Sequence, residues 1–160
     1  MARIIEKILL NKITDGYINI PKENVKKLRK IKINFATHPI PSLKGIKGVR
    51  KILKLTKGLT KNDLIIFLLS GGASALLPLP KNGISLKDKQ KITKLLLNSG
   101  ASIDEINIIR KHLSEIKGGG FIKHSYPAKV ISLIISDVVG DRLDIIGSAP
   151  TVPDSSSYND

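Results

Sequence analysis

The sequence contains no cysteine and no tryptophan, and only three phenylalanines and three tyrosines among 160 residues. Without cysteine, neither disulfide bonds nor thiolate metal sites can form. The few aromatic side chains leave little surface on which nucleic-acid bases could stack. No apolar segment is long enough to span a membrane, and charged residues interrupt the first ten positions, unlike in a signal peptide. We therefore expect a cytoplasmic protein with no membrane partner.

Basic residues are abundant: the sequence has 27 Lys and Arg but only 13 Asp and Glu, which gives a net charge of +14. Such a charge favours nucleic acid as a partner when it is concentrated on one face. Here the lysines are spread along the chain, and the densest cluster, residues 22–32, is predicted to lie on a surface helix or loop. A basic run without a binding motif is weak evidence. We favour a solvated basic surface, with a non-catalytic nucleic-acid-binding protein as the alternative to an enzyme.

Short apolar runs alternate with segments of helical periodicity, which predicts a single α/β domain. The run 64–69 has no polar alternation and predicts a strand buried on both faces, and further strands are expected at 17–20, 31–36 and 130–135. Helix start signals occur at Ser85 with Asp88, and at the capping box Ser102 with Glu105. The residues expected to form the buried stripes of these two helices are Ile92, Leu95, Leu96, Ile106, Ile109, Leu113 and Ile116. The pattern is that of a doubly wound parallel sheet, in which ligands bind at the carboxyl ends of the strands.

A loop of small residues, 70–74, follows the first long apolar strand. Ser70, Gly71, Gly72 and Ser74 have little bulk, so backbone N–H groups and hydroxyls can approach a phosphate or carboxylate. Glycine pairs after strands also serve simply to turn the chain, and short glycine motifs are often false positives. Both interpretations remain open on the pattern alone.

A basic polar face recurs along the helix predicted after Ser102. Its members, at helical spacing opposite much of the apolar stripe, are Asn107, Arg110, Lys111, Ser114 and Lys117. This face can bind an anion, but every surface helix also presents a solvated polar face.

Two aspartates, Asp137 and Asp141, flank Gly140 in the loop after the strand at 130–135. They could hold Mg²⁺ through one or two carboxylates, with water and phosphate completing the coordination shell. Aspartate beside glycine is also a common turn signal. His38, which precedes Pro39, is interpreted as packing within its loop.

Several segments, in their order and spacing, resemble the glycerate 2-kinases of the two-domain, MOFRL-containing type. They are residues 70–80, 86–90, 99–107, 110–114, 117–119, 135–138 and 148–154. The resemblance implies a Rossmann-like N-terminal domain with helices on both faces of its parallel sheet. In that family, this domain and a C-terminal domain form a cleft where ATP phosphorylates the 2-hydroxyl of D-glycerate.

The resemblance also implies residue roles. Arg110 and Asp137 would be catalytic, and Asp137 with Asp141 would hold Mg²⁺. The residues implied to bind substrate or phosphate are Ser70, Gly71, Gly72, Ser74, Asn107 and Lys117. Against the family pattern, residues 1–160 correspond to an N-terminal domain without its opening strand, and the C-terminal MOFRL domain is absent. We therefore expect a fragment or split subunit that is inactive alone; as a split subunit, it would be completed by a separately encoded chain.

Overall fold

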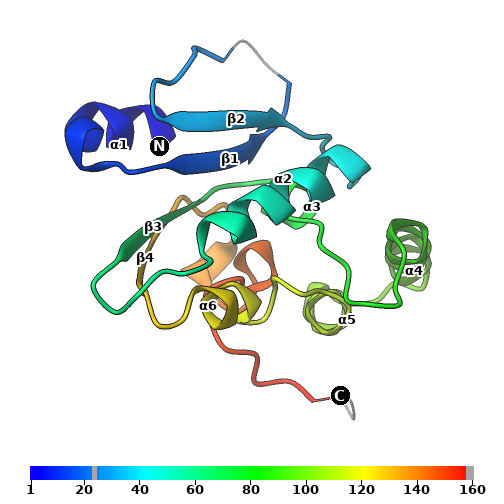
Figure 1. The fold of residues 1–160 in the computed structure, drawn as a ribbon. Coiled ribbons are helices and arrows are strands. Elements are labelled where there is room, and N and C mark those ends of the chain that lie inside the picture. The colour runs from blue at the N-terminus through cyan, green and yellow to red at the C-terminus, as the bar shows by residue number, and fades with distance from the viewer. Residues whose placement is uncertain (23–24, 158–160) are drawn as a thin grey trace.

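The computed structural model describes residues 1–22 and 25–157 (Figure 1). Their helices are α1 (Ala2–Leu9), α2 (Leu43–Leu55), α3 (Ala73–Leu76), α4 (Leu86–Asn98), α5 (Ile103–His112) and α6 (Gly120–Ser125), with 3₁₀ turns η1 (Leu10–Lys12), η2 (Val139–Asp141) and η3 (Ile146–Ser148). The strands are β1 (Gly16–Ile20), β2 (Ile31–Phe35), β3 (Leu64–Leu69) and β4 (Lys129–Ile134). The α/β class and the four expected strands are confirmed.

The strands form two parallel pairs, β1 with β2 and β3 with β4. Helix α2 packs on both pairs: its Gly48 lies against Asn19 of β1, and its Val49 belongs to the same core as Phe67 of β3. A Cβ atom at Gly48 would lie 1.7 Å from the Asn19 Oδ1 atom, so only glycine allows this approach. The two pairs therefore share one layer beneath α2. Among the described residues, no hydrogen bond joins one pair to the other.

The core lies on the α2 side of β3 and β4. The Phe67 and Phe121 rings pack with their centroids 4.4 Å apart, and Val49 and Ile116 are fully buried beside them. This core holds β3 against α2 and α6, and it thereby fixes the position of the loop that follows β3.

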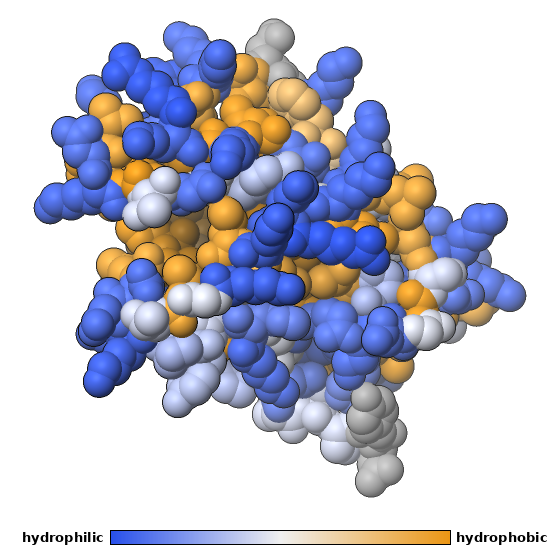
Figure 2. Space-filling model, in the orientation of Figure 1, coloured by the Kyte–Doolittle hydropathy of each residue, from blue (hydrophilic) through white to orange (hydrophobic). Residues whose placement is uncertain are grey.

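The opposite face of β3 and β4 is open. Leu64 and Ile131 are 55% and 49% exposed, and Ile135 just beyond β4 is exposed as well. The expected burial of strand 64–69 on both faces is therefore wrong, because no described helix covers this face. Figure 2 shows apolar side chains in a hollow between the part of the molecule containing α1, β1 and β2 and the part containing β3 and β4.

Two residues expected in the buried stripes of the helices are exposed instead. Leu95 of α4, expected in the buried stripe, is exposed, and so is Ile109 of α5.

The basic segment before β2, expected as a surface helix or loop, is a loop over its described residues, with positions 23 and 24 outside the described part. The backbone N–H groups of Arg29 and Lys30 donate to the Glu6 carboxylate there. In the described part of the chain, no helix is both long enough and apolar enough to cross a membrane.

Candidate functional site

The loops that follow β3 and β4 lie at the same edge, because the two strands are parallel. They enclose one side of a cavity of about 170 Å³. Seven of the residues named from the sequence line this cavity together: Ser70, Gly71, Gly72, Ser74, Asn107, Arg110 and Asp137. Residues separated by up to 67 positions are thus brought into one site by the fold.

The glycine loop is tightly packed on both sides. Gly72 has φ +80°, and a Cβ atom there would lie 2.7 Å from the His38 ring. A Cβ atom on Gly71 would lie 3.4 Å from the Asp137 Oδ2 atom, so the loop faces that carboxylate. His38 follows β2 and belongs to the same edge of the sheet layer. The sequence interpretation of His38 as a packed loop residue did not foresee its contact with the glycine loop.

Helix α5 carries Asn107 and Arg110 to the cavity. The capping box is confirmed: the Glu105 backbone N–H donates to the Ser102 hydroxyl, and the Ser102 backbone N–H donates to the Glu105 carboxylate. The helix ends at His112, earlier than expected, because the chain turns to form a bridge between Ser114 and Pro80. Ser114 and Lys117 therefore lie beyond the helix.

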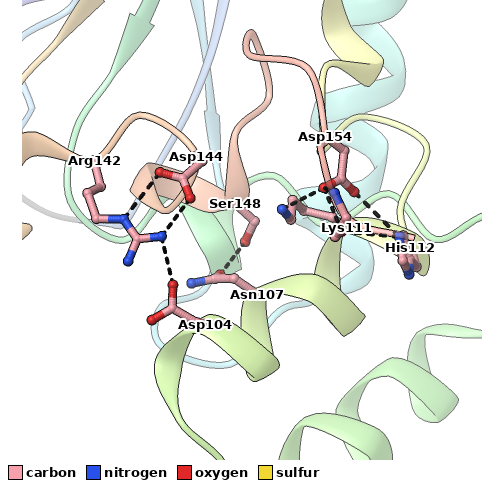
Figure 3. Close-up of polar contacts among 9 residues, drawn as sticks. Asp104, Asn107, Lys111, His112, Arg142, Asp144, Ser148 and Asp154 are labelled. Carbon is pink, nitrogen blue, oxygen red and sulfur yellow. Dashed lines mark hydrogen bonds and ion pairs between the residues drawn. The ribbon is translucent and has the colours of Figure 1, made fainter. Parts of the chain in front are cut away.

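The polar face expected along this segment is buried. Asn107, Lys111, Ser114 and Lys117 are all shielded from solvent, so the interpretation as a solvated face is wrong for these four. The Lys117 ammonium donates to the Gly147 carbonyl at 2.8 Å and to the Ser148 hydroxyl at 3.3 Å. The same hydroxyl donates to the Asn107 side-chain oxygen at 2.9 Å (Figure 3). Lys117 and Asn107 thus bind the loop at 147–148, which forms one wall of the cavity.

The two aspartates proposed for Mg²⁺ differ in position. Asp137 lines the cavity, whereas Asp141 is exposed and is not among the lining residues. Residues 1–22 and 25–157 contain no group of three or more His, Asp or Glu side chains arranged to hold a metal ion. A magnesium ion that keeps most of its water and phosphate ligands needs only one or two carboxylates, and of the predicted pair only Asp137 lines the cavity.

Comparison with known proteins places this architecture in a family. The family model described as "Domain of unknown function (DUF4147)" matches residues 1–160. The chain belongs to the DUF4147 family.

Curated relatives of this DUF4147 chain include D-glycerate 2-kinase from Thermotoga maritima, 54% identical over 125 residues, which cover 78% of this chain and 30% of that protein. Glycerate 2-kinase from Pyrococcus horikoshii is 46% identical over 160 residues, which cover 100% of this chain and 36% of the relative. The crystal structure of glycerate kinase from Thermotoga maritima superposes with a TM-score of 0.95 at 47% identity, over 98% of this chain and 38% of that one. The resemblance to glycerate 2-kinases is confirmed. The chain spans about a third of the length of these relatives.

Two buried clusters that contain basic residues lie near this site in the DUF4147 chain. In the first, the Lys111 ammonium lies 2.6 Å from the Asp154 carboxylate, which also accepts from the Ser156 hydroxyl at 2.7 Å and lies 3.6 Å from His112 (Figure 3). Burial alone would raise the pKa of Asp154, but the hydrogen bonds from Lys111 and Ser156 outweigh it and lower the pKa. This cluster is a complete ion pair.

The second cluster consists of Lys89, Arg110 and Lys117, and it was not foreseen from the sequence. Lys89 of α4 is 7% exposed, and its ammonium has no hydrogen-bond partner among the described residues. Burial, and secondarily the charge of Arg110, lowers its pKa to about 8. Burial also lowers the pKa of Arg110 and holds that of Lys117 well below its ordinary value. The one available sequence signal was that Lys89 lies three and seven residues before Ile92 and Leu96, on the apolar face of its helix.

Proposed function

We propose that this chain supplies the substrate-binding part of a glycerate 2-kinase, which phosphorylates the 2-hydroxyl of D-glycerate at the expense of ATP. The observation that carries the proposal is the single cavity in which the glycine loop, Arg110 and Asp137 meet. The printed functions of the curated relatives support it.

The chemistry of the cavity suits phosphoryl transfer. This reaction needs hydrogen-bond donors and cations around a negative charge that spreads over the transferred group. Ser70, Ser74 and the backbone of the glycine loop supply donors, and the Arg110 guanidinium can bind a carboxylate through two parallel N–H bonds. Asp137, whose carboxylate lies beside Gly71 in the cavity lining, would hold the Mg²⁺ of the nucleotide or orient the substrate hydroxyl. Lys117 and Asn107 would keep the wall at 147–148 in place.

The size of the cavity favours the small acid over the nucleotide. A volume of about 170 Å³ suits a three-carbon acid and its phosphoryl group. Sites for larger ligands usually measure about 300–1,000 Å³. We infer that ATP is bound mainly by protein outside residues 1–160, in the same longer polypeptide or in a separately encoded chain.

The two strand pairs also support the proposal that protein outside residues 1–160 completes the enzyme. Strands β1 and β3 share a layer, yet each has an unpaired edge within the described structure, and the outer face of β3 and β4 is apolar and open. Unpaired edges invite pairing with a further strand. A parallel strand between β1 and β3 would restore the doubly wound order in which the first strand is central. We propose that this strand and a second domain over the cavity come from the missing part of the enzyme.

The test is an ATP- and D-glycerate-dependent kinase assay of the purified chain, alone and mixed with separately expressed segments from the same genome that supply both the opening strand and the C-terminal domain. We expect activity only in the mixture. Arg110→Ala should lower kcat/KM by about 100-fold or more, because it removes charge that stabilises the transition state. The matched control Arg142→Ala, which removes an exposed arginine paired with Asp104 and Asp144, should leave activity unchanged.

The same assay separates the two aspartates. Asp137→Asn should abolish most activity, whereas Asp141→Asn should do so only if both carboxylates hold Mg²⁺. A folded mixture without activity, or an Arg110→Ala variant as active as the parent, would contradict the proposed function.

A further inference from the structure

Lys89 is the most unusual polar side chain of the described structure. It lies on α4, outside the lining of the cavity, and it is buried against a region that contains Arg110 and Lys117. Its ammonium nitrogen is the only buried side-chain nitrogen or oxygen in the described part of the chain that lacks a hydrogen-bond partner.

Such an arrangement opposes folding. A buried ammonium without a partner loses its hydration and gains nothing in return. The Arg110 charge adds repulsion, and no carboxylate of residues 1–22 or 25–157 pairs with Lys89, Arg110 or Lys117. A methionine or leucine at position 89 would satisfy the packing of α4 at lower cost, so packing does not explain the lysine.

The donors that remain unused indicate what the cluster can bind. Lys89 has three N–H bonds without a partner among the described residues, and the Arg110 guanidinium, which lines the cavity, carries five N–H donors. Lys117 uses two of its three N–H bonds on Gly147 and Ser148. The donors of three basic side chains exceed what one carboxylate can satisfy. They match a phosphate dianion, which has more acceptor oxygens and twice the charge.

We propose that Lys89, together with Arg110 and Lys117, forms a binding site for a phosphoryl dianion at the α4–α5 side of the cavity. Lys89 is the member of this site whose buried ammonium has no hydrogen-bond partner among the described residues. The inference deepens the proposed function, because it gives the phosphoryl group its own cationic partners, apart from the loop at 70–74. Binding of an anion at this site does not depend on kinase activity.

The probe is inorganic phosphate, titrated into the purified chain and followed by calorimetry and by NMR of the lysine side chains. Lys89→Met removes the charge and keeps the unbranched shape. Lys94→Gln removes a lysine charge from an exposed position of the same helix and serves as the matched control. We expect Lys89→Met to weaken phosphate binding about tenfold and Lys94→Gln to weaken it less than twofold. Acetate, a monoanion, should bind the parent chain at least tenfold more weakly than phosphate.

A second measurement needs no variant. In the parent chain, the ε-methylene resonance of Lys89 should shift with phosphate along the same saturation curve as the backbone signal of Arg110. Equal phosphate affinity in the parent and Lys89→Met would overturn the proposal, as would an unshifted Lys89 resonance or no phosphate binding up to about 20 mM. Phosphate binding that depends on Lys89, in a reconstituted mixture without kinase activity, would support this site and contradict only the proposed function.

Discussion

Lys111 on α5 and Lys89 on α4 are buried to nearly the same degree, at 8% and 7% exposed, but their surroundings are opposite. Lys111 meets the Asp154 carboxylate at 2.6 Å, whereas Lys89 is acted on by the Arg110 charge and has no acceptor among the described residues. A buried charge with a partner connects two parts of a fold, here the segment after η3 and helix α5. A buried charge without a partner is a cost to the folded chain, and we attribute its presence to a ligand.

The largest expected effect on stability comes from breaking the ion pair between Lys111 and Asp154. Asp154→Asn leaves the Lys111 ammonium buried without a counter-charge, which should lower the free energy of unfolding by about 3–5 kcal/mol. Urea denaturation at pH 7 measures this. Asp144→Asn, which removes a carboxylate from an exposed pair with Arg142, is the control and should cost about 1 kcal/mol or less. An Asp154→Asn variant as stable as the parent would show that the two lysines do not differ as described.

Removing the buried charge of Lys89 should stabilise the folded chain instead of destabilising it. Without ligand, Lys89→Met should raise the free energy of unfolding at pH 7 by about 3 kcal/mol, the cost of lowering the pKa from 10.5 to about 8. The same denaturation experiment, with Lys94→Gln as control, checks it. A loss of stability in Lys89→Met would mean that the lysine has a structural partner after all.

Raising the pH should also increase the stability of the folded chain, because it removes the buried charge of Lys89. Its pKa is lower in the folded chain than in the unfolded chain, so the unfolded chain binds more protons between about pH 8 and pH 10.5. The destabilisation by this group therefore grows as the pH falls from 10.5 to 8, and it is relieved as the pH rises through the same range. Between pH 7 and pH 9.5 we expect the parent to gain about 2 kcal/mol relative to Lys89→Met. Parallel pH profiles for the two chains would contradict this.

The smallest effect concerns the helices that carry the two lysines. Ser85 caps α4 and Ser102 caps α5, each in a capping box. Ser85→Ala and Ser102→Ala should each lower the free energy of unfolding by about 1 kcal/mol. Thermal unfolding of both variants would show whether the helices contribute equally. A much larger loss in one of them would indicate that its cap also holds the neighbouring cluster.

Much of the fold was accessible from the sequence, because its signals are local. The apolar runs predicted the four strands, and the serine–acid pairs at 85–88 and 102–105 marked the starts of α4 and α5. The gathering of the 70–74 loop and Asp137 at one edge followed as well, since parallel strands end on the same side. Arg110 and Asn107 joined them because α5 begins where its capping box predicts.

Other features depended on contacts that no local pattern contains. The early end of α5 at His112 follows from the bridge between Ser114 and Pro80, and the open face of β3 follows from the absence of a described helix above it. Lys89 resembles the many surface lysines of this chain until α5 packs beside it.

The sequence by itself determined the strands, the helix starts and the small-residue loop, because backbone preference and apolar periodicity act over a few neighbouring residues. Only the tertiary structure decided which charges are paired. Lys111 pairs with Asp154 across 43 positions of chain, while Lys89 is brought near Arg110 and Lys117 with no carboxylate partner in the described part of the chain. The difference arises from burial, since a charge removed from water is stabilised or destabilised by whatever the folded chain places next to it.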